Sequence, residues 1–212
     1  MKSLGFLVGV AVLATSAPTS IQAQDPDHAV QGGGMLPEGW HARVDRDRGM
    51  ENILLEENDG ALHVKLGPAV ILYRAADEAS GNFTVTASFK QAEALQHSES
   101  YGIFIGGKNL DGADQAYTYF LVRDAGQFLV KKRDGAEAAN VTDGWAAHDA
   151  VATEIGETNT LVVTATDSEV TFSVNGVEVY SGARDGLFVD GVVGLRTNHN
   201  LELSIEGFAV ER

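Results

Sequence analysis

The sequence predicts an all-β fold in which two antiparallel sheets stack as a β-sandwich. Residues 83–90 alternate apolar and polar side chains, as a half-buried antiparallel strand does. Asn175-Gly176 separates two short β-rich runs, which is the strongest short-range signal for a hairpin. About a dozen β-rich runs separated by turn residues fit a two-sheet sandwich, and no internal repeat indicates a propeller or a solenoid.

The Asn175-Gly176 hairpin predicts which residues face one another. A type I′ turn needs positive φ at both central residues, and asparagine and glycine tolerate this best. A two-residue loop places Val174 opposite Val177 and Phe172 opposite Val179, with all four side chains on one side. We expect this side to face the core.

The other elements follow from the same patterns. In the last strand the apolar phase changes between Ile205 and Phe208, which predicts a β-bulge at Gly207. Residues 92–99 form the one segment in which a short helical turn is expected. Further strands are predicted at 40–44, 53–55, 62–66, 71–74, 101–106, 117–123, 127–133 and 161–166, with a hairpin turn at 58–60.

Composition restricts the classes of function. The 212 residues suffice for one domain that buries roughly 70% of its unfolded surface. The formal net charge of −15 and the pI near 4.6 argue against nucleic-acid binding, because a polyanion would be repelled. The chain has no cysteine, which excludes disulfides and thiolate metal sites.

The N-terminus has the layout of a secretory signal peptide. Lys2 precedes an apolar run that ends at Ala14, and Ala23 offers a small-residue cleavage site. We expect residues 1–23 to be removed and the product to be exported to the periplasm or the cell exterior. The apolar run is too short to span ~30 Å of hydrocarbon, so no membrane insertion is expected after cleavage. Residues 24–34 are expected to be a flexible lead-in to a sandwich domain over residues 35–212.

A hairpin over residues 117–133 provides the first candidate binding face. A three-residue loop ending in Gly126 sets the register. Aromatic rings stack on the apolar faces of sugars, and forked Arg donors suit hydroxyls and carboxylates. The alternative is a solvated edge hairpin whose charges only limit aggregation. The pairs on the candidate face are Arg123 with Gln127, Leu121 with Leu129, Tyr119 with Lys131, and Tyr117 with Arg133.

The last fifty or so residues resemble a known group of proteins. An Asn-Gly hairpin is followed by the pattern G-x-V-G-L-[RQ]-x-[NH] and a closing strand with a Phe. This is similar to concanavalin A-like and laminin G-like jelly-roll domains, in particular the 3-keto-disaccharide hydrolase family and related secreted bacterial proteins. The matching residues are Asn175, Gly176, Gly191, Val193, Gly194, Leu195, Arg196, Asn198 and Phe208.

The resemblance implies a jelly-roll sandwich whose ligand lies across the concave sheet. It places Arg196, Asn198 and His199 near that ligand, although Asn-His-Asn is also an ordinary turn composition. Proteins of the resembled family usually have Gln and His where this chain has Arg196 and Asn198. Trp145 and His148 lie in a polar loop that either covers a sugar site or covers the edge of the core.

Catalytic signals are weak. Glu202-x-Ser204-x-Glu206 is similar to the E-x-D-x-E strand of laminarinase-like glycosidases, with Ser in place of the middle Asp. Residues four apart on a strand start about 13 Å apart at Cα, whereas retaining hydrolysis needs carboxyls about 5–5.5 Å apart. We therefore interpret this segment as a solvent-facing row of acids and predict no catalytic residues.

No cofactor is expected, and structural calcium is a minor alternative. Two acidic loops, Asp45-x-Asp47-x-Gly49-x-Glu51 and Asn109-x-Asp111 with Asp114, offer the oxygen ligands that calcium prefers. Neither loop matches a full ligand set. The six histidines are scattered without metal-ligand spacing.

The sequence thus predicts an exported, lectin-like protein that binds an oligo- or polysaccharide without catalysis. The ligand-binding residues are expected to be Tyr117, Tyr119, Arg123, Lys131, Arg133, Arg196, Asn198 and His199. An enzyme acting on keto-disaccharides or related glycosides is the main alternative, as the resemblance implies. A structural or interaction domain without a small ligand is the third.

Overall fold

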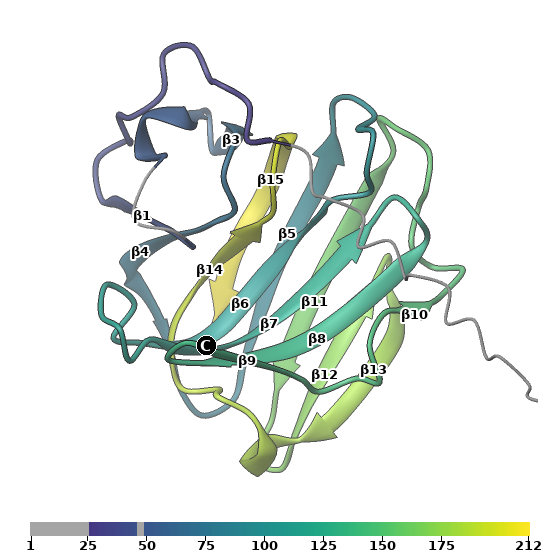
Figure 1. The fold of residues 1–212 in the computed structure, drawn as a ribbon. Helices are drawn as coiled ribbons and strands as arrows, with labels where there is room; N and C mark the ends of the chain where they lie inside the picture. The colour runs from purple at the N-terminus through teal and green to yellow at the C-terminus, as the bar shows by residue number, and fades with distance from the viewer. Residues whose placement is uncertain (1–25, 46–48) are drawn as a thin grey trace, which may run out of the picture.

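Two antiparallel sheets pack face to face in the computed structural model, which describes residues 26–45 and 49–212 (Figure 1). Within these residues, eight strands form sheet A and seven form sheet B. The predicted two-sheet sandwich is confirmed. The predicted signal peptide and the first residues of the predicted lead-in lie outside the described residues.

Sheet A combines strands from both halves of the chain. The first strand pairs with the fourth, and a strand near the C-terminus lies between the fourth and the sixth. The order across the sheet is β1 (Trp40–Val44), β4 (Val70–Ala79), β14 (Gly191–Thr197), β6 (Ser100–Lys108), β7 (Ala116–Arg123), β8 (Gln127–Asp134) and β10 (Ala146–Ala147), and β9 (Glu137–Asn140) also pairs with β8.

Sheet B is built in the same interleaved way, because the last strand lies between the third and the fifth. The only described helical turns are η1 (Met50–Asn52) and η2 (Arg184–Gly186). The order across sheet B is β13 (Val177–Ala183), β12 (Glu169–Val174), β11 (Thr158–Ala165), β5 (Phe83–Gln91), β15 (Glu202–Glu211), β3 (Ala61–Leu66) and β2 (Ile53–Asn58).

The main core lies between the two sheets. Phe120 of sheet A contacts Phe172 of sheet B with ring centroids 5.4 Å apart, and Phe89 contacts Tyr101 across the sandwich at 5.2 Å. Each of these rings is at most 2% exposed. Burying one such side chain contributes roughly 1.5–3 kcal/mol, so the alternating residues of the strands account for the packing of the two sheets.

The predicted hairpins are largely confirmed. All four pairs predicted between residues 117 and 133 are present, from Tyr117 with Arg133 to Arg123 with Gln127. Val174 faces Val177, but Phe172 faces Tyr180 rather than Val179. A shift in register between Phe172 and Ser173 adds one residue on the β13 side. The expected pairing is therefore wrong by one residue beyond this bulge.

Two other local expectations have opposite outcomes. Gly207 has a φ of 62°, and the register between β15 and β5 shifts between Glu206 and Ala209, so the predicted bulge is confirmed. Residues 92–99 form bends and no helical turn. Gln91 donates to the carbonyl of Glu93 at 2.8 Å, and this local hydrogen bond competes with a helical turn at that point.

The described part of the lead-in is attached to the sandwich. The backbone N–H of His28 donates to Oδ1 of Asn200 at 2.7 Å, and that of Val30 donates to Oδ1 of Asn52 at 3.1 Å. Val30 is 7% exposed. Hydrogen bonds and packing therefore attach His28 and Val30 to the sandwich. No helix among the described residues is long and apolar enough to span a bilayer.

Candidate functional site

The outer face of sheet A carries a second buried cluster. Strands alternate their side chains between two faces, so the neighbours of core residues such as Leu72 and Phe120 point outward. An outer sheet face that is apolar and buried marks a surface with more than a solvating role. The cluster consists of Ile71, Tyr73, Phe104, Leu110, Tyr117, Tyr119 and Leu121, with Trp145 and Val192 packed against it.

Four of these residues form a continuous row of rings. Tyr73 meets Phe104 edge to face at 6.4 Å, Phe104 meets Tyr117 at 5.3 Å, and Tyr117 meets Tyr119 at 5.5 Å. Gly194 of β14 lies opposite both Tyr73 and Phe104. A Cβ at Gly194 would lie 2.5 Å from a ring carbon of Phe104. The glycine therefore makes room for the central ring to lie across the sheet.

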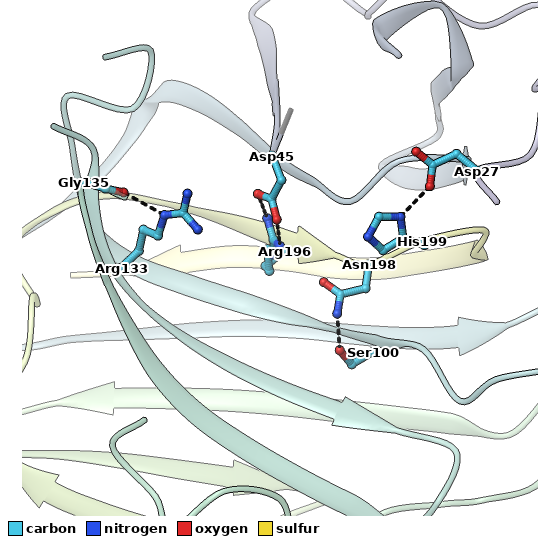
Figure 2. A network of polar contacts seen from close by, with 8 residues as sticks. All are labelled: Asp27, Asp45, Ser100, Arg133, Gly135, Arg196, Asn198 and His199. Carbon is cyan, nitrogen blue, oxygen red and sulfur yellow. Dashed lines mark hydrogen bonds and ion pairs between the residues drawn. The ribbon is translucent and has the colours of Figure 1, made fainter. Parts of the chain in front are cut away.

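An arginine–carboxylate fork lies above these rings. Arg196 donates from Nη1 and Nη2 to the two carboxylate oxygens of Asp45 at 2.7 and 2.6 Å (Figure 2). The Arg196 guanidinium lies 6.0 Å from the ring centroid of Tyr119. Asp45 directly follows β1, and its backbone N–H donates to the carbonyl of Ala69. The sheet thus positions both partners of a bidentate pair.

The electrostatics of the pair follow from its partial burial. Burial alone would raise the pKa of Asp45, but the hydrogen bonds and charge of Arg196 hold it below its ordinary value of 3.8. Burial by itself would lower the pKa of Arg196. The hydrogen bonds and the negative charge of Asp45 outweigh this effect and raise the pKa of Arg196 above its ordinary value. Burial raises the pKa of Tyr119 to about 12. At neutral pH the face therefore presents a carboxylate, a guanidinium and neutral tyrosines.

The two tyrosines are less accessible than the sequence indicated. Tyr117 is 2% exposed and Tyr119 is 8% exposed, so neither ring is an open stacking platform. They form the floor of the face, beneath the polar side chains of β8 and β14. Trp145 is the half-buried aromatic residue at this surface, and the guanidinium of Arg123 stacks on its ring at 4.2 Å.

The other sequence-predicted residues share this face. Arg133 lies opposite Tyr117 and donates from Nε to the carbonyl of Gly135 at 2.9 Å (Figure 2). Lys131 is half-buried opposite Tyr119. The face thus brings together residues from the 117–133 hairpin and from β14, as the resemblance implied.

Asn198 and His199 continue the face beyond β14. Asn198 donates from Nδ2 to Oγ of Ser100 at 2.8 Å, and Nδ1 of His199 lies 2.6 Å from a carboxylate oxygen of Asp27 (Figure 2). The His199 side chain is 17% exposed. His199 follows Arg196 by three residues, so the imidazole lies in the segment that continues from β14 beyond the fork.

Sequence reasoning missed four residues of the site: Asp27, Asp45, Tyr73 and Phe104. Asp45 was considered only as a calcium ligand, and Asp27 as part of a lead-in. One signal could have found Phe104, because residues 101–106 are apolar on both faces. An outward-pointing apolar residue in a central strand indicates a covered outer face.

Comparison with known proteins identifies the family. The sequence profile described as a 3-keto-alpha-glucoside-1,2-lyase-like domain matches residues 30–205. The chain belongs to this family. No curated protein matches the sequence significantly.

Solved structures share the fold of this lyase-like domain at low identity. The carbohydrate-binding module CBM66 from Bacillus subtilis is 11% identical with a TM-score of 0.61, over 82% of this chain and 96% of that one. A protein of unknown function with a galectin-like fold from Bacillus subtilis is 14% identical with a TM-score of 0.57, over 81% and 88% of the two chains. A functionally unknown protein from Saccharomyces cerevisiae is 10% identical with a TM-score of 0.52, over 81% and 95%.

The acidic strand of this lyase-like domain lies on the other sheet. Glu202 is part of β15 in sheet B, and it binds Lys65 at 2.5 Å and His63 at 3.0 Å. These hydrogen bonds hold the pKa of Glu202 below its ordinary value. Glu202 and Glu206 share the outer side of sheet B with Ser204, because Leu203 and Ile205 point to the core. They lie on the opposite side of the sandwich from the aromatic face.

Acidic residues in the two loops considered for calcium have protein hydrogen-bond partners. Asp45 binds Arg196, and Asp47 lies outside the described residues. In the other loop Tyr73 donates its hydroxyl to Asp111 at 2.7 Å, and Asn109 donates to Asp114 at 2.8 Å. Over residues 26–45 and 49–212, no three acidic, histidine or cysteine side chains gather as a metal site.

Two cavities lie apart from the aromatic floor. One of about 590 Å³ is lined by Lys108, Arg184 and Asp190, among others. Arg184 there binds Asp190 and donates to two backbone carbonyls, so its donors are used in holding the loop. The other, of about 430 Å³, is lined by His28 and Asn200 with residues 93–97.

His148, the loop residue considered as a cover for a sugar site or for the core edge, packs on Phe128 with ring centroids 6.3 Å apart. It therefore covers the edge of the core.

Proposed function

We propose that this chain binds a carbohydrate on the outer face of sheet A, as an exported sugar-binding domain. The observation that carries the proposal is the combination of a buried aromatic floor with an arginine fork and further cations above it. Sugars present apolar ring faces and a rim of hydroxyls, which aromatic surfaces and fixed polar donors recognise together. Support also comes from the shared fold with CBM66, which is named a carbohydrate-binding module.

Binding is favoured over catalysis because few groups on the face suit proton transfer at neutral pH. A general base works best with a pKa near the working pH. The pKa of Tyr119 is about 12, and Arg196 keeps the pKa of Asp45 low. Neither residue is therefore suited to exchange protons near neutrality.

Titration calorimetry with neutral and acidic oligosaccharides tests the proposal. Trp145→Ala removes the half-buried ring under Arg123 and should weaken binding about tenfold. Phe208→Ala is the matched control, because this half-buried ring belongs to β15 of sheet B. Absence of heat with every glycan, or equal losses in both variants, would contradict binding on this face. Thermal unfolding of each variant separates lost binding from lost folding.

The family and one further contact favour a second candidate function. A 1,2-elimination on a 3-keto-glucoside needs a base that removes the proton at C2, beside the C3 carbonyl. The C1–O bond then breaks, a C1=C2 double bond forms, and the departing oxygen takes a proton. Asp27 orients His199 through Nδ1 at 2.6 Å, in the arrangement by which a carboxylate positions an imidazole base.

Turnover of a 3-keto-α-glucoside decides between the two candidates. If the domain is a lyase, His199→Asn should lower kcat by about 10²–10⁴-fold. Asp27→Asn should lower kcat less and shift the pH profile. Lys90→Gln, an exposed change on sheet B, should leave the rate unchanged. A parent protein that binds glycans but shows no turnover leaves binding as the function.

A further inference from the structure

The outer face of sheet A concentrates positive charge in an acidic protein. The chain has 15 basic and 30 acidic residues. Arg43 lies opposite Ile71, which lies opposite Arg196, so both arginines point outward on β1 and β14. Arg123, Lys131 and Arg133 add three cations from the hairpin on the other side. A third of the basic residues thus share one sheet face.

Three of these cations converge on the tyrosine floor. Arg43 and Arg196 are separated by one strand, which places their Cα atoms roughly 10 Å apart. Arg133 approaches from β8, where it pairs with Tyr117. The charges of Arg196, Arg133 and Arg43 all act on the Tyr117 hydroxyl, against the larger effect of burial. We call Arg43, Arg133 and Arg196 the arginine cluster.

The donors of the arginine cluster exceed the protein acceptors around them. Nε of Arg43 and Nε of Arg196 are buried, and neither has a hydrogen-bond partner among the described residues. Arg196 is only 7% exposed. A buried donor without an acceptor is unfavourable, and within residues 26–45 and 49–212 the only ion pair of the cluster joins Arg196 to Asp45. The arrangement is suited to a further anionic acceptor.

We propose that the arginine cluster recognises the anionic group of an acidic sugar, either a uronate carboxylate or a sulfate ester. This inference rests on the proposed carbohydrate-binding function. Arg196 already holds one carboxylate, that of Asp45, in a bidentate fork. Planar guanidinium groups pair with such anions through parallel hydrogen bonds. Trp145, the half-buried ring at this surface, then contacts the apolar part of the sugar.

Calorimetry with three oligosaccharides of equal length tests the inference: neutral, uronate-containing and sulfated. The parent protein should bind at least one acidic ligand about tenfold more tightly than the neutral one, and this preference should fall as salt rises. Arg133→Gln and Arg43→Gln should each weaken binding of the acidic ligand more than binding of the neutral one, so that most of the preference is lost. Lys90→Gln is the control for a lost positive charge elsewhere.

The outcomes separate the two proposals. Equal binding of acidic and neutral ligands, or equal losses with Lys90→Gln and Arg133→Gln, overturns the acidic-sugar inference and leaves carbohydrate binding intact. Failure of all three ligands to bind overturns both. A preference for the uronate over the sulfated ligand, or the reverse, identifies the anionic group. Thermal unfolding of each variant shows that a lost preference does not reflect a lost fold.

Discussion

At the scale of single residues, the ion pair between Asp45 and Arg196 joins positions 151 apart in the sequence. Arg196 is 7% exposed, and the Asp45 side chain is 35% exposed. Removing the carboxylate leaves a largely buried guanidinium without its main acceptor. Asp45→Asn should therefore lower the free energy of unfolding by about 1–2 kcal/mol at neutral pH, because partial exposure of Asp45 weakens the pair.

The pH dependence of this pair gives the second half of the same prediction. Because folding lowers the pKa of Asp45, the pair stabilises fully above the ordinary value of 3.8 and is lost as pH falls through the lowered pKa. Urea unfolding at ~pH 6 and at ~pH 3 should show the difference between parent and Asp45→Asn shrinking in acid. Asp143→Asn, at an exposed position, should stay within ~0.5 kcal/mol of the parent. A difference of the same size at both pH values contradicts this account.

Phe172 provides a prediction for the core. Its side chain is fully buried and contacts Phe120 at 5.4 Å and Tyr180 at 5.9 Å. Phe172→Ala should lower the free energy of unfolding by about 3–5 kcal/mol, because the surrounding sheets cannot close the cavity. Chemical denaturation measures this. A loss within ~0.5 kcal/mol would show that the ring is not part of the core.

Contacts at this scale were predictable only where they are local. Tyr119 opposite Lys131 follows from the length of one loop and the two-residue period of a strand. The partners of His199 and Arg196 do not, because Asp27 and Asp45 lie far away in the sequence. No local pattern indicates which distant carboxylate meets which cation.

At the scale of elements, the β12–β13 hairpin shows what turn chemistry determines. Asn175 and Gly176 have φ of 51° and 80°, as a type I′ turn requires. The Asn175 side chain also accepts from the backbone N–H of Thr160 at 2.8 Å. The turn was therefore predictable, whereas the bulge that moves Phe172 opposite Tyr180 was not, because a two-residue loop sets the register only for the pairs next to it.

Gly176 gives the prediction at this scale. Gly176→Ala should cost about 1–2 kcal/mol, because a residue with a Cβ resists the left-handed region. Gly186→Ala is the matched control, since its backbone is ordinary and a Cβ there meets open space. Urea unfolding of both variants checks this. Equal effects of the two substitutions would show that the turn conformation does not matter.

At the scale of the whole molecule, the sandwich and the family were predictable from the C-terminal quarter, but the strand order was not. The pattern around Gly194 and Arg196 indicates one strand, yet its neighbours β4 and β6 come from the middle of the chain. The burial of the aromatic residues on the outer face of sheet A depends on this strand order, because the order places Tyr73 beside Phe104. The burial of Tyr117 therefore does not follow from its pairing with Arg133, which was predicted correctly.

Export is the prediction for the whole chain. Lys2, the apolar run and Ala23 predict removal of residues 1–23. Intact-mass measurement of the extracytoplasmic fraction should give a product that begins at Gln24. Full-length protein confined to the cytoplasm would contradict the prediction.

The anchoring of residues 26–34 determines an order of folding events. His28 bonds to Asn200, 172 residues further along the chain. Synthesis runs from the N-terminus to the C-terminus, so Asp27 and His28 have no partners until the segment between β14 and β15 has been made. Contacts of such long separation form slowly, because the chain must first close a large loop. The pairing of Asp27 with His199 thus reports the completion of folding, and its rate of formation should follow that of β14 and β15.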